Sequence, residues 1–379
     1  MAKILILGAG IAGHTAASHL RRKLSKEHEV VVVSPNRNYQ WVPSNIWVGI
    51  GRMKSDEVFF PLEPLYKRKG IGYKQAKVIS FHPEGDATET KGFVTIEYIF
   101  GKNAGVQEKV NYDYLINATG PKLAFELTEG LNPGTNKAYS VCTYEHAAHA
   151  SEALLKLIGD IKTSDKKAKI LIGTGHAKAT CQGAAFEYIL NVEKELVRYG
   201  VRDKIELTWI SNENELGDFG MDGMLLTYGN QTLKSSELVE MVFADHGIKW
   251  ILGAGVFKID EGKAHYENLE GEYKEEDFDF AMLIPSFSGH GFKAFDKNEN
   301  DITDKLFKGF MIVDADYTSK PYEEWTVQDW PETYQNPNYA NIFAPGIAFA
   351  PPHSISKPRK SKNGTDIFPS PPRTGMPSG

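Results

Sequence analysis

The sequence predicts an α/β protein with two Rossmann-like dinucleotide-binding folds in one chain, and two observations carry this prediction. Residues 2–17 read as an apolar strand, a turn with Gly8, Gly10 and Gly13, and then a helix. That order binds a pyrophosphate at the helix N-terminus. The strand residues 2–6 (AKILI) recur as 168–172 before Gly173, so a second fold of the same kind is expected to start near Lys167.

Composition excludes several classes of protein. The 379 residues suffice for two domains, and 41% hydrophobic with 24% charged residues is ordinary for a globular protein. A net charge of −6 does not indicate nucleic-acid binding. No run approaches the roughly 18 apolar residues of a membrane span, and the chain opens directly into its first strand, so no signal peptide is expected. We also expect no metal site.

The remaining segments predict a discontinuous first domain. After the first turn, 29–34 reads as a buried strand, and 112–120 reads as a strand that ends in Ala118, Thr119 and Gly120. Residues 341–349 read as a further strand and turn, whereas the Pro-, Lys- and Ser-rich stretch 351–379 reads as a loop or tail. The expected boundaries are a first domain at 1–125 plus 285–379, a connecting segment at 126–164 and a second domain at 165–284.

Both folds depart from the usual nucleotide pattern. The second strand of such a fold ordinarily ends in an acidic residue that holds the ribose, but here the first fold has Ser34 and the second has Ser211. In the second turn, Lys178 stands where a glycine is needed. The second fold therefore reads as one that has lost its nucleotide.

A cysteine follows this second turn. Cys181 is preceded by His176 and Lys178, two side chains that can favour a thiolate, and the only other cysteine of the chain is Cys142. A dinucleotide site combined with a thiol, and without a clear pyridine-nucleotide site, is typical of sulfur redox chemistry.

These features together resemble the flavoprotein disulfide reductase superfamily and, within it, the sulfide:quinone oxidoreductases. The segments that carry the resemblance are the first glycine turn, 39–51, 117–126, 141–146, Cys181 with 184–188, and 341–348. The resemblance implies FAD in the first fold, held by Gly8, Gly10, Gly13, Ser34, Asn36, Arg37, Ser44, Asn45, Val78, Ala118, Thr119, Gly120, Gly346, Ile347, Arg373, Thr374 and Gly375.

The same resemblance implies roles for three further side chains. Cys181 matches the cysteine that carries persulfide beside the flavin, and Cys142 matches a cysteine at the flavin edge. His146, four residues after Cys142, is expected one helical turn away, where it would relay protons. The partner cysteine of the family, and the elements that attach it to membranes, are expected in a C-terminal region beyond Gly379.

The resemblance implies two-electron oxidation of sulfide to polysulfide or elemental sulfur, with a quinone as electron acceptor. The expected partners are sulfide, quinone and a membrane surface, and the expected location is that of a monotopic protein; a homo-oligomer is compatible with this. Three alternatives stay open at this point. They are the flavoprotein of a flavocytochrome c sulfide dehydrogenase, a type II NADH dehydrogenase, and a non-catalytic flavin- or sulfur-binding protein.

Overall fold

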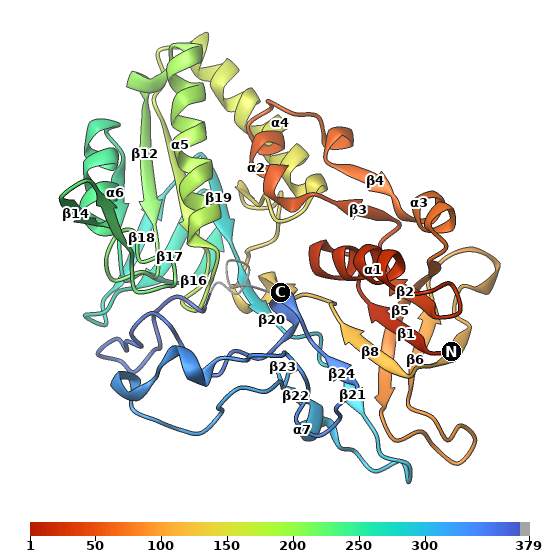
Figure 1. Cartoon of the computed structure of the whole chain (residues 1–379). Helices are drawn as coiled ribbons and strands as arrows, with labels where there is room; N and C mark the ends of the chain where they lie inside the picture. The colour runs from red at the N-terminus through yellow and green to blue at the C-terminus, as the bar shows by residue number, and fades with distance from the viewer. Residues whose placement is uncertain (372–379) are drawn as a thin grey trace.

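The computed structural model describes residues 1–371, and it is an α/β protein with two major sheets (Figure 1). Arg373, Thr374 and Gly375 lie outside the described residues. Helices occupy α1 (Ile11–Lys23), α2 (Asn45–Gly49), α3 (Leu62–Lys69), α4 (Tyr144–Lys162), α5 (Gln182–Tyr199), α6 (Ser235–Asp245) and α7 (Thr303–Leu306).

The first sheet takes its strands from both ends of the chain. Its order is β24-β8-β1-β2-β5-β6-β7, with β21 paired to β5. The strands are β1 (Lys3–Leu7), β2 (Glu29–Ser34), β5 (Gly72–His82), β6 (Phe93–Tyr98), β7 (Gln107–Asn111), β8 (Tyr114–Asn117), β21 (Lys293–Ala294) and β24 (Ile342–Phe343). The sheet thus combines strands from residues 3–117 with strands from residues 293–343.

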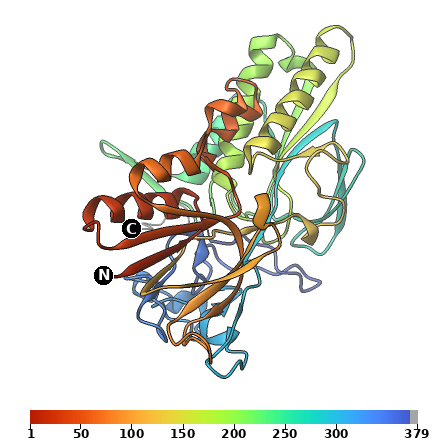
Figure 2. The ribbon, with the colours of Figure 1, turned by 90° about the vertical axis from the view of Figure 1, so that its right-hand side faces the viewer.

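Both faces of the central strands are buried, which explains their continuous apolar runs. Ile4 and Ile6 pack in one cluster with residues of α1 and α3, whereas Leu5 and Leu7 pack in another with residues of β6, β7 and β24. Figures 1 and 2 show α1 lying along one side of this sheet.

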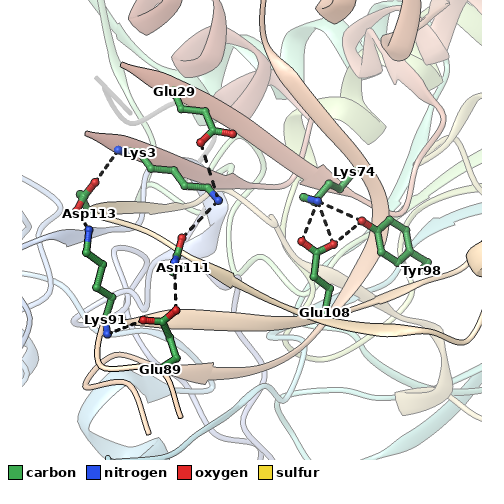
Figure 3. A network of polar contacts seen from close by, with 9 residues as sticks. All are labelled: Lys3, Glu29, Lys74, Glu89, Lys91, Tyr98, Glu108, Asn111 and Asp113. Atoms are coloured by element: carbon green, nitrogen blue, oxygen red, sulfur yellow. Dashed lines mark hydrogen bonds and ion pairs between the residues drawn. The ribbon is translucent and has the colours of Figure 1, made fainter. Parts of the chain in front are cut away.

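A polar network ties the outer strands of the first sheet to its centre (Figure 3). Lys74 on β5 donates to both oxygens of Glu108 on β7, at 2.9 and 3.0 Å, so a hydrogen-bonded ion pair crosses β6. These contacts raise the pKa of Lys74 against the opposing effect of desolvation, the largest single influence. At the other side, the Lys3 amide donates to Asp113 at 2.7 Å.

The second sheet repeats the design of the first. Its five strands are parallel in the order β10-β19-β11-β12-β15. Their bounds are β10 (Ala138–Tyr139), β11 (Ala168–Thr174), β12 (Ile205–Ile210), β15 (Lys249–Ile251) and β19 (Phe280–Ile284). One face packs against α4 and α5, and the other packs against the antiparallel strands β16 (Gly255–Asp260), β17 (Lys263–Glu267) and β18 (Tyr273–Asp277).

Short strand pairs complete the structure. They are β3 (Asn38–Gln40) with β4 (Phe59–Pro61), β9 (Lys122–Ala124) with β20 (Ser286–Ser288), β13 (Leu225–Tyr228) with β14 (Gln231–Lys234), and β22 (Phe307–Lys308) with β23 (Phe310–Met311). Residues 351–371 form no helix or strand, as the composition predicted, but this loop is packed, because Ile367 and Phe368 are buried.

The two major sheets are joined through α2, which belongs to the first half of the chain. The Asn45 amide donates to the Val141 carbonyl at 3.0 Å, and the Tyr188 hydroxyl of α5 donates to the Gly49 carbonyl at 3.0 Å. Arg52 forms an ion pair with Glu195 of α5 at 2.5 Å, and the Glu195 side chain is only 3% exposed. These contacts fix α2 against the helices of the second sheet.

Candidate functional site

The first glycine turn is tightly packed at two positions and open at the third. Gly8 has a φ of +94°, and a Cβ there would lie 2.2 Å from the Ala118 carbonyl oxygen. A Cβ at Gly13 would lie 2.1 Å from the Gly8 carbonyl oxygen, whereas a Cβ at Gly10 would meet nothing within 4 Å. Packing therefore requires glycine at 8 and 13, and the chain beside Gly10 is open to a ligand.

The helix that starts at this opening is suited to a phosphate. The N-cap of α1 is Gly10, which has no capping side chain, and the first turn of the helix carries no acidic residue. The first intrahelical bond runs from the His14 amide to the Gly10 carbonyl at 2.8 Å, so the amides before it are left for another acceptor. The positive end of the helix and these amides fit a dinucleotide pyrophosphate.

Other residues predicted for the flavin dinucleotide surround this opening. A Cβ at Gly346 would lie 3.2 Å from the Ala12 Cβ of α1, so the turn at 346–347 rests on the same helix. Thr119 donates its amide and hydroxyl to Asn117 Oδ1, at 3.3 and 2.8 Å, which shapes the turn at 118–120.

Ser34 ends β2, next to the ribose position predicted from the sequence. It is buried, and its Oγ accepts the Asn36 amide at 3.2 Å, whereas the Asn36 and Arg37 side chains are exposed. Val78 lies on β5, two strands from β1 and half-buried. The ribose position thus has polar groups but no carboxylate at the end of β2.

Ser44 and Asn45 lie at the start of α2. Asn45 is 1% exposed, and its Oδ1 accepts from Gln40 at 3.0 Å while its side-chain amide donates to the Val141 carbonyl at 3.0 Å. Because Val141 precedes Cys142, the second of these bonds joins Asn45 to the backbone of the segment that carries Cys142.

The relation predicted between Cys142 and His146 is wrong in one respect. Helix α4 begins at Tyr144 with Thr143 as its N-cap, so Cys142 lies before the helix and the two residues do not form an i,i+4 pair. The Thr143 side chain accepts the His146 amide as the N-cap, so the helix starts after Cys142. Burial raises the pKa of the Cys142 thiol to about 11, against a smaller opposing effect of Ser140.

His146 has a buried ring nitrogen available for chemistry. Its backbone amide donates to the Thr143 hydroxyl at 3.1 Å, and its ring meets Phe125 edge-on with centroids 5.7 Å apart. Among residues 1–371, its Nδ1 finds no hydrogen-bond partner. Desolvation lowers the pKa of His146, which keeps the imidazole neutral and able to accept a proton.

The second glycine turn has the glycine backbone that is typical of a nucleotide-binding turn, but it has no space for a phosphate. Gly173 has a φ of +153°, and a Cβ there would lie 1.8 Å from the Ile210 carbonyl oxygen, as close a strand contact as at Gly8. Gly175 occupies the position equivalent to Gly10. A Cβ there would lie 2.6 Å from Leu131 and 3.1 Å from Leu283, so protein side chains fill the place where a phosphate would approach.

A strap of the C-terminal loop, residues 367–370, crosses this second turn. The Phe368 amide donates to the Ala177 carbonyl and the Ser370 amide donates to the Ala179 carbonyl, both at 3.1 Å. The Ser370 hydroxyl donates to the Lys178 carbonyl at 2.8 Å, and the Lys178 ammonium lies 3.2 Å from the centroid of the Phe368 ring. The strap is therefore bonded to three successive residues of the second turn.

Cys181 is the N-cap of α5 and has a left-handed backbone, with φ 66° and ψ 34°. A non-glycine residue in that region costs roughly 1–3 kcal/mol, and such strain gathers at functional sites. The N-terminus of an α-helix favours negative charge that lies within its first turn, and Cys181 stands at the N-cap position of α5. His176 accepts the Lys178 amide at its Nδ1, at 3.0 Å, so this ring nitrogen is committed within the turn.

Several residues of this region were missed by sequence reasoning. Asn212 and Gln182 are fully buried beside Cys181, and the ring of His290 hydrogen-bonds the backbone at Thr119 and Gly120. A signal for Asn212 was present in the sequence, because it follows Ser211 at the strand end where a nucleotide fold places its ribose ligand. No local pattern marks His290 or the strap, since both are brought in from distant segments.

Several known proteins are similar to this chain. The family model described as "Pyridine nucleotide-disulphide oxidoreductase" matches residues 2–184. A sulfide-quinone reductase of Aquifex aeolicus is 29% identical over 377 residues, covering 99% of this chain and 73% of the relative. A mitochondrial sulfide:quinone oxidoreductase of Dictyostelium discoideum is 25% identical and covers 76% of this chain and 57% of the relative.

Solved structures agree with the sequence relatives. The crystal structure of the Aquifex aeolicus sulfide:quinone oxidoreductase matches with a TM-score of 0.74 at 28% identity, over 99% of this chain and 73% of that one. NDH2 of Plasmodium falciparum matches with a TM-score of 0.62 at 17% identity, over 92% of this chain and 64% of that one, and shows a shared fold only. The chain is therefore similar to the sulfide:quinone oxidoreductases over nearly its whole length, and its residues 2–184 match the pyridine nucleotide-disulphide oxidoreductase family.

Proposed function

We propose that this chain oxidises sulfide and delivers the electrons to a quinone, with FAD as its resident cofactor. One observation carries the proposal: of two turns with the same design, the first is open at Gly10 and the second is filled at Gly175. The first accepts a dinucleotide, and the second leaves a cysteine at a helix N-terminus in place of a nucleotide. A pyridine nucleotide as electron donor, as in type II NADH dehydrogenases, would need the second turn.

The cofactor would be held by groups that the first fold supplies. The amides at the start of α1 would bind the pyrophosphate, and Ser34, Asn36 and Arg37 would offer polar groups for the ribose. Val78 would pack beside the adenine. The turns at 118–120 and 346–347 would close the site, and Ser44 and Asn45 would approach the flavin end. Bound there, the flavin supplies an acceptor for two electrons from sulfur and a donor of two electrons to the quinone.

The sulfur chemistry is assigned to Cys181. Its thiolate, stabilised by the N-terminus of α5, would hold a sulfur atom as a persulfide. An incoming hydrosulfide attacks the outer sulfur, so that a new S–S bond forms while the bond to Cys181 Sγ breaks, and the Cys181 thiolate and a disulfide anion (HSS⁻) are released. Forming the persulfide again from sulfide removes two electrons, which the flavin, when bound, would accept. His146 is neutral, because its pKa is lowered by desolvation, and its Nδ1 is available. We assign it the proton that hydrogen sulfide releases. Polysulfide or elemental sulfur is the product that we propose.

Anaerobic stopped-flow spectroscopy tests this function. The holoprotein should show flavin absorption that sulfide bleaches, and a soluble ubiquinone analogue should restore the absorption. A flavoprotein of the cytochrome-linked type would be reoxidised by cytochrome c and not by the quinone analogue. Holoprotein that sulfide leaves unbleached would favour a non-catalytic flavin-binding protein.

We further propose that the protein works at a membrane surface, because its second substrate resides in the bilayer. No helix among residues 1–371 is long and apolar enough to cross a membrane, so attachment to one leaflet is proposed. Co-sedimentation of the full-length protein with phospholipid vesicles tests this, and protein that stays in the supernatant at every lipid concentration contradicts it. Light scattering of the same sample determines whether it is a homo-oligomer.

A further inference from the structure

Asn212 is buried beneath the turn that carries Cys181, and each polar group of its side chain is bonded to that turn or to α5. The residue is 1% exposed. Its amide nitrogen donates to the Ala177 carbonyl at 3.0 Å and to the Ala179 carbonyl at 3.1 Å. Its Oδ1 accepts from Gln182 Nε2 at 2.9 Å. The side chain thus contacts the chain on both sides of Cys181.

The same two carbonyls are also bonded by the strap on the other side. The Phe368 amide reaches the Ala177 oxygen and the Ser370 amide reaches the Ala179 oxygen, so each carbonyl accepts two hydrogen bonds. Gln182 Nε2 adds a bond to the Ala179 oxygen at 3.2 Å. Because the carbonyl groups of this short turn accept so many hydrogen bonds, its backbone has little conformational freedom just before Cys181.

The position of Asn212 in the fold indicates what these bonds do. It lies two residues after the end of β12, next to Ser211, in the region where a Rossmann fold directs a side chain toward the nucleotide ribose. Here the Asn212 backbone amide donates to the Thr174 hydroxyl at 3.1 Å, and the side chain turns toward the loop. In a nucleotide-binding fold, the bound pyrophosphate contacts the backbone of this turn. Here the Asn212 side chain makes hydrogen bonds to the backbone of the turn instead.

We propose that Asn212 is a positioning residue for Cys181: its amide holds the 177–182 turn so that the thiol stays at the N-terminus of α5 in its left-handed conformation. This inference rests on the proposed function for the importance of Cys181, and it concerns the geometry of the thiol alone. The stabilisation of a thiolate by a helix terminus depends on the sulfur lying within the first turn. Loss of that placement raises the pKa of the thiol.

The substitution Asn212→Asp tests the N–H donors of the side chain, because it removes them. It keeps the size and the acceptor for Gln182, but it puts a carboxylate oxygen against the Ala177 and Ala179 carbonyls, which repel it. We expect flavin reduction by sulfide to slow at least about tenfold, because catalytic groups displaced by ~1 Å can lose 10²-fold in rate. The FAD content should not change, since no residue of the first turn is touched.

Asn336→Asp is the matched control. Asn336 is likewise 1% exposed, its amide donates to the Ile312 carbonyl at 2.9 Å, and its Oδ1 accepts the Asn338 amide at 3.0 Å. The control therefore places a carboxylate against a buried carbonyl in the first domain, away from the cysteine turn. It should lower the melting temperature to a similar extent and leave the chemistry of Cys181 unchanged.

The reporting measurement is the pH dependence of alkylation of Cys181 by iodoacetamide, in holoprotein that also carries Cys142→Ser. We expect Asn212→Asp to raise the pH midpoint by about half a unit or more, the scale of a helix-terminus interaction, and Asn336→Asp to leave it unchanged. If Asn212→Asp does not fold, Ser370→Ala removes one bond to the same turn and should shift the midpoint in the same direction.

If the pH midpoint of Cys181 alkylation is the same in wild type, Asn212→Asp and Ser370→Ala, the positioning role is overturned. This holds even if sulfide reduces the flavin of the wild-type protein normally. A shifted midpoint in a protein that sulfide does not reduce would support the positioning role and contradict the proposed function. The two proposals therefore fail on different measurements.

Discussion

Cys181 and Cys142 are in opposite chemical environments, although both are half-buried. Cys181 caps a helix of 18 residues from a left-handed backbone, where the field of the helix favours the thiolate. Cys142 precedes α4, and burial raises its pKa to about 11. At neutral pH only Cys181 has a structural reason to be a nucleophile.

The first prediction follows from this contrast. Cys181→Ser keeps the size of the side chain but removes the sulfur nucleophile, and a hydroxyl is far weaker at neutral pH. Sulfide-dependent flavin reduction should fall by roughly two orders of magnitude or more, while FAD stays bound. Stopped-flow reduction of the full-length variant measures this.

Cys142→Ser is the companion variant, and it should cost less activity because its thiol is protonated at neutral pH. Near-normal reduction in Cys181→Ser, or a larger loss in Cys142→Ser, would contradict the assignment of sulfur transfer to Cys181.

A second prediction concerns Gly10, whose φ of −73° any residue can adopt. Gly10→Val should fold, because nothing lies within 4 Å of the new Cβ, but its side chain occupies the space predicted for the pyrophosphate. We expect the FAD content of the purified protein to fall about tenfold or more, the scale of a lost charged contact. Absorbance after gel filtration measures it.

Gly159→Ala on α4 is a suitable control for this variant, because its Cβ also meets open space. If Gly10→Val retains full FAD, the cofactor does not approach this turn and the site assignment is wrong.

Among the elements, the loop from β12 to β13 depends on a buried carboxyl group. Glu213 is fully buried, accepts the Ser211 hydroxyl at 2.7 Å and accepts the Phe219 amide at 2.7 Å. Desolvation raises the pKa of Glu213 to about 8, and the nearby Asp218 adds to this. Asp218 itself hydrogen-bonds Ser356 of the C-terminal loop, so the two loops are held together by acidic side chains.

The third prediction is a pH dependence of stability. Between the unfolded pKa near 4.5 and the folded pKa of about 8, the unfolded carboxyl is ionised while the folded one is protonated. The folded state then binds more protons, so stability falls as pH rises through this window and is constant with respect to Glu213 above it. Urea unfolding of wild type and Glu213→Gln at pH 5 and pH 8.5 measures this.

The amide of the variant mimics the protonated acid, so wild type should lose stability relative to Glu213→Gln as pH rises. About 5 kcal/mol is the ceiling set by the shift, at 1.36 kcal/mol per pKa unit. A constant difference between the two proteins would show that Glu213 is ionised in the fold.

The elements that the sequence predicted are those with local signals. The strand at 29–34, the first glycine turn and the strand at 168–174 all carry continuous apolar runs or glycine spacing that depend on nearby residues alone. Cys142 and His146 were misplaced relative to each other, because spacing does not reveal that Thr143 starts the helix. The strap over the second turn depends on contacts between 177–179 and 367–370, which no local pattern reports.

At the scale of the whole molecule, the same three-layer unit is used twice for different purposes. In each half, helices cover one face of the parallel strands and antiparallel strands pack toward the other. In the first half these are β6 and β7, which continue the sheet from β5, whereas in the second half β16, β17 and β18 form a separate sheet. The bonds from α2 to Val141 and α5 hold the halves together. The first unit presents an open turn, and the second presents a closed turn with a thiol.

The fourth prediction tests this division of roles. NADH and NADPH should reduce the flavin at least about a hundredfold more slowly than sulfide, since a site without its phosphate and ribose contacts loses several kcal/mol of binding. Leu131→Ala enlarges the space at Gly175 but leaves the strap in place, so it should not create NADH activity. Flavin that NADH bleaches as fast as sulfide does would indicate the dehydrogenase alternative.

The pairing of β24 with β8 has a consequence during synthesis of the protein. The ribosome releases β8 roughly 200 residues before β24, a delay of roughly 10–40 s at ~5–20 residues per second. Through that interval the nascent first sheet has an open edge at β8, and the turn at Gly346 is not yet present to rest on α1. Chaperones that shield exposed strand edges therefore have a defined target on this chain until β24 has been released.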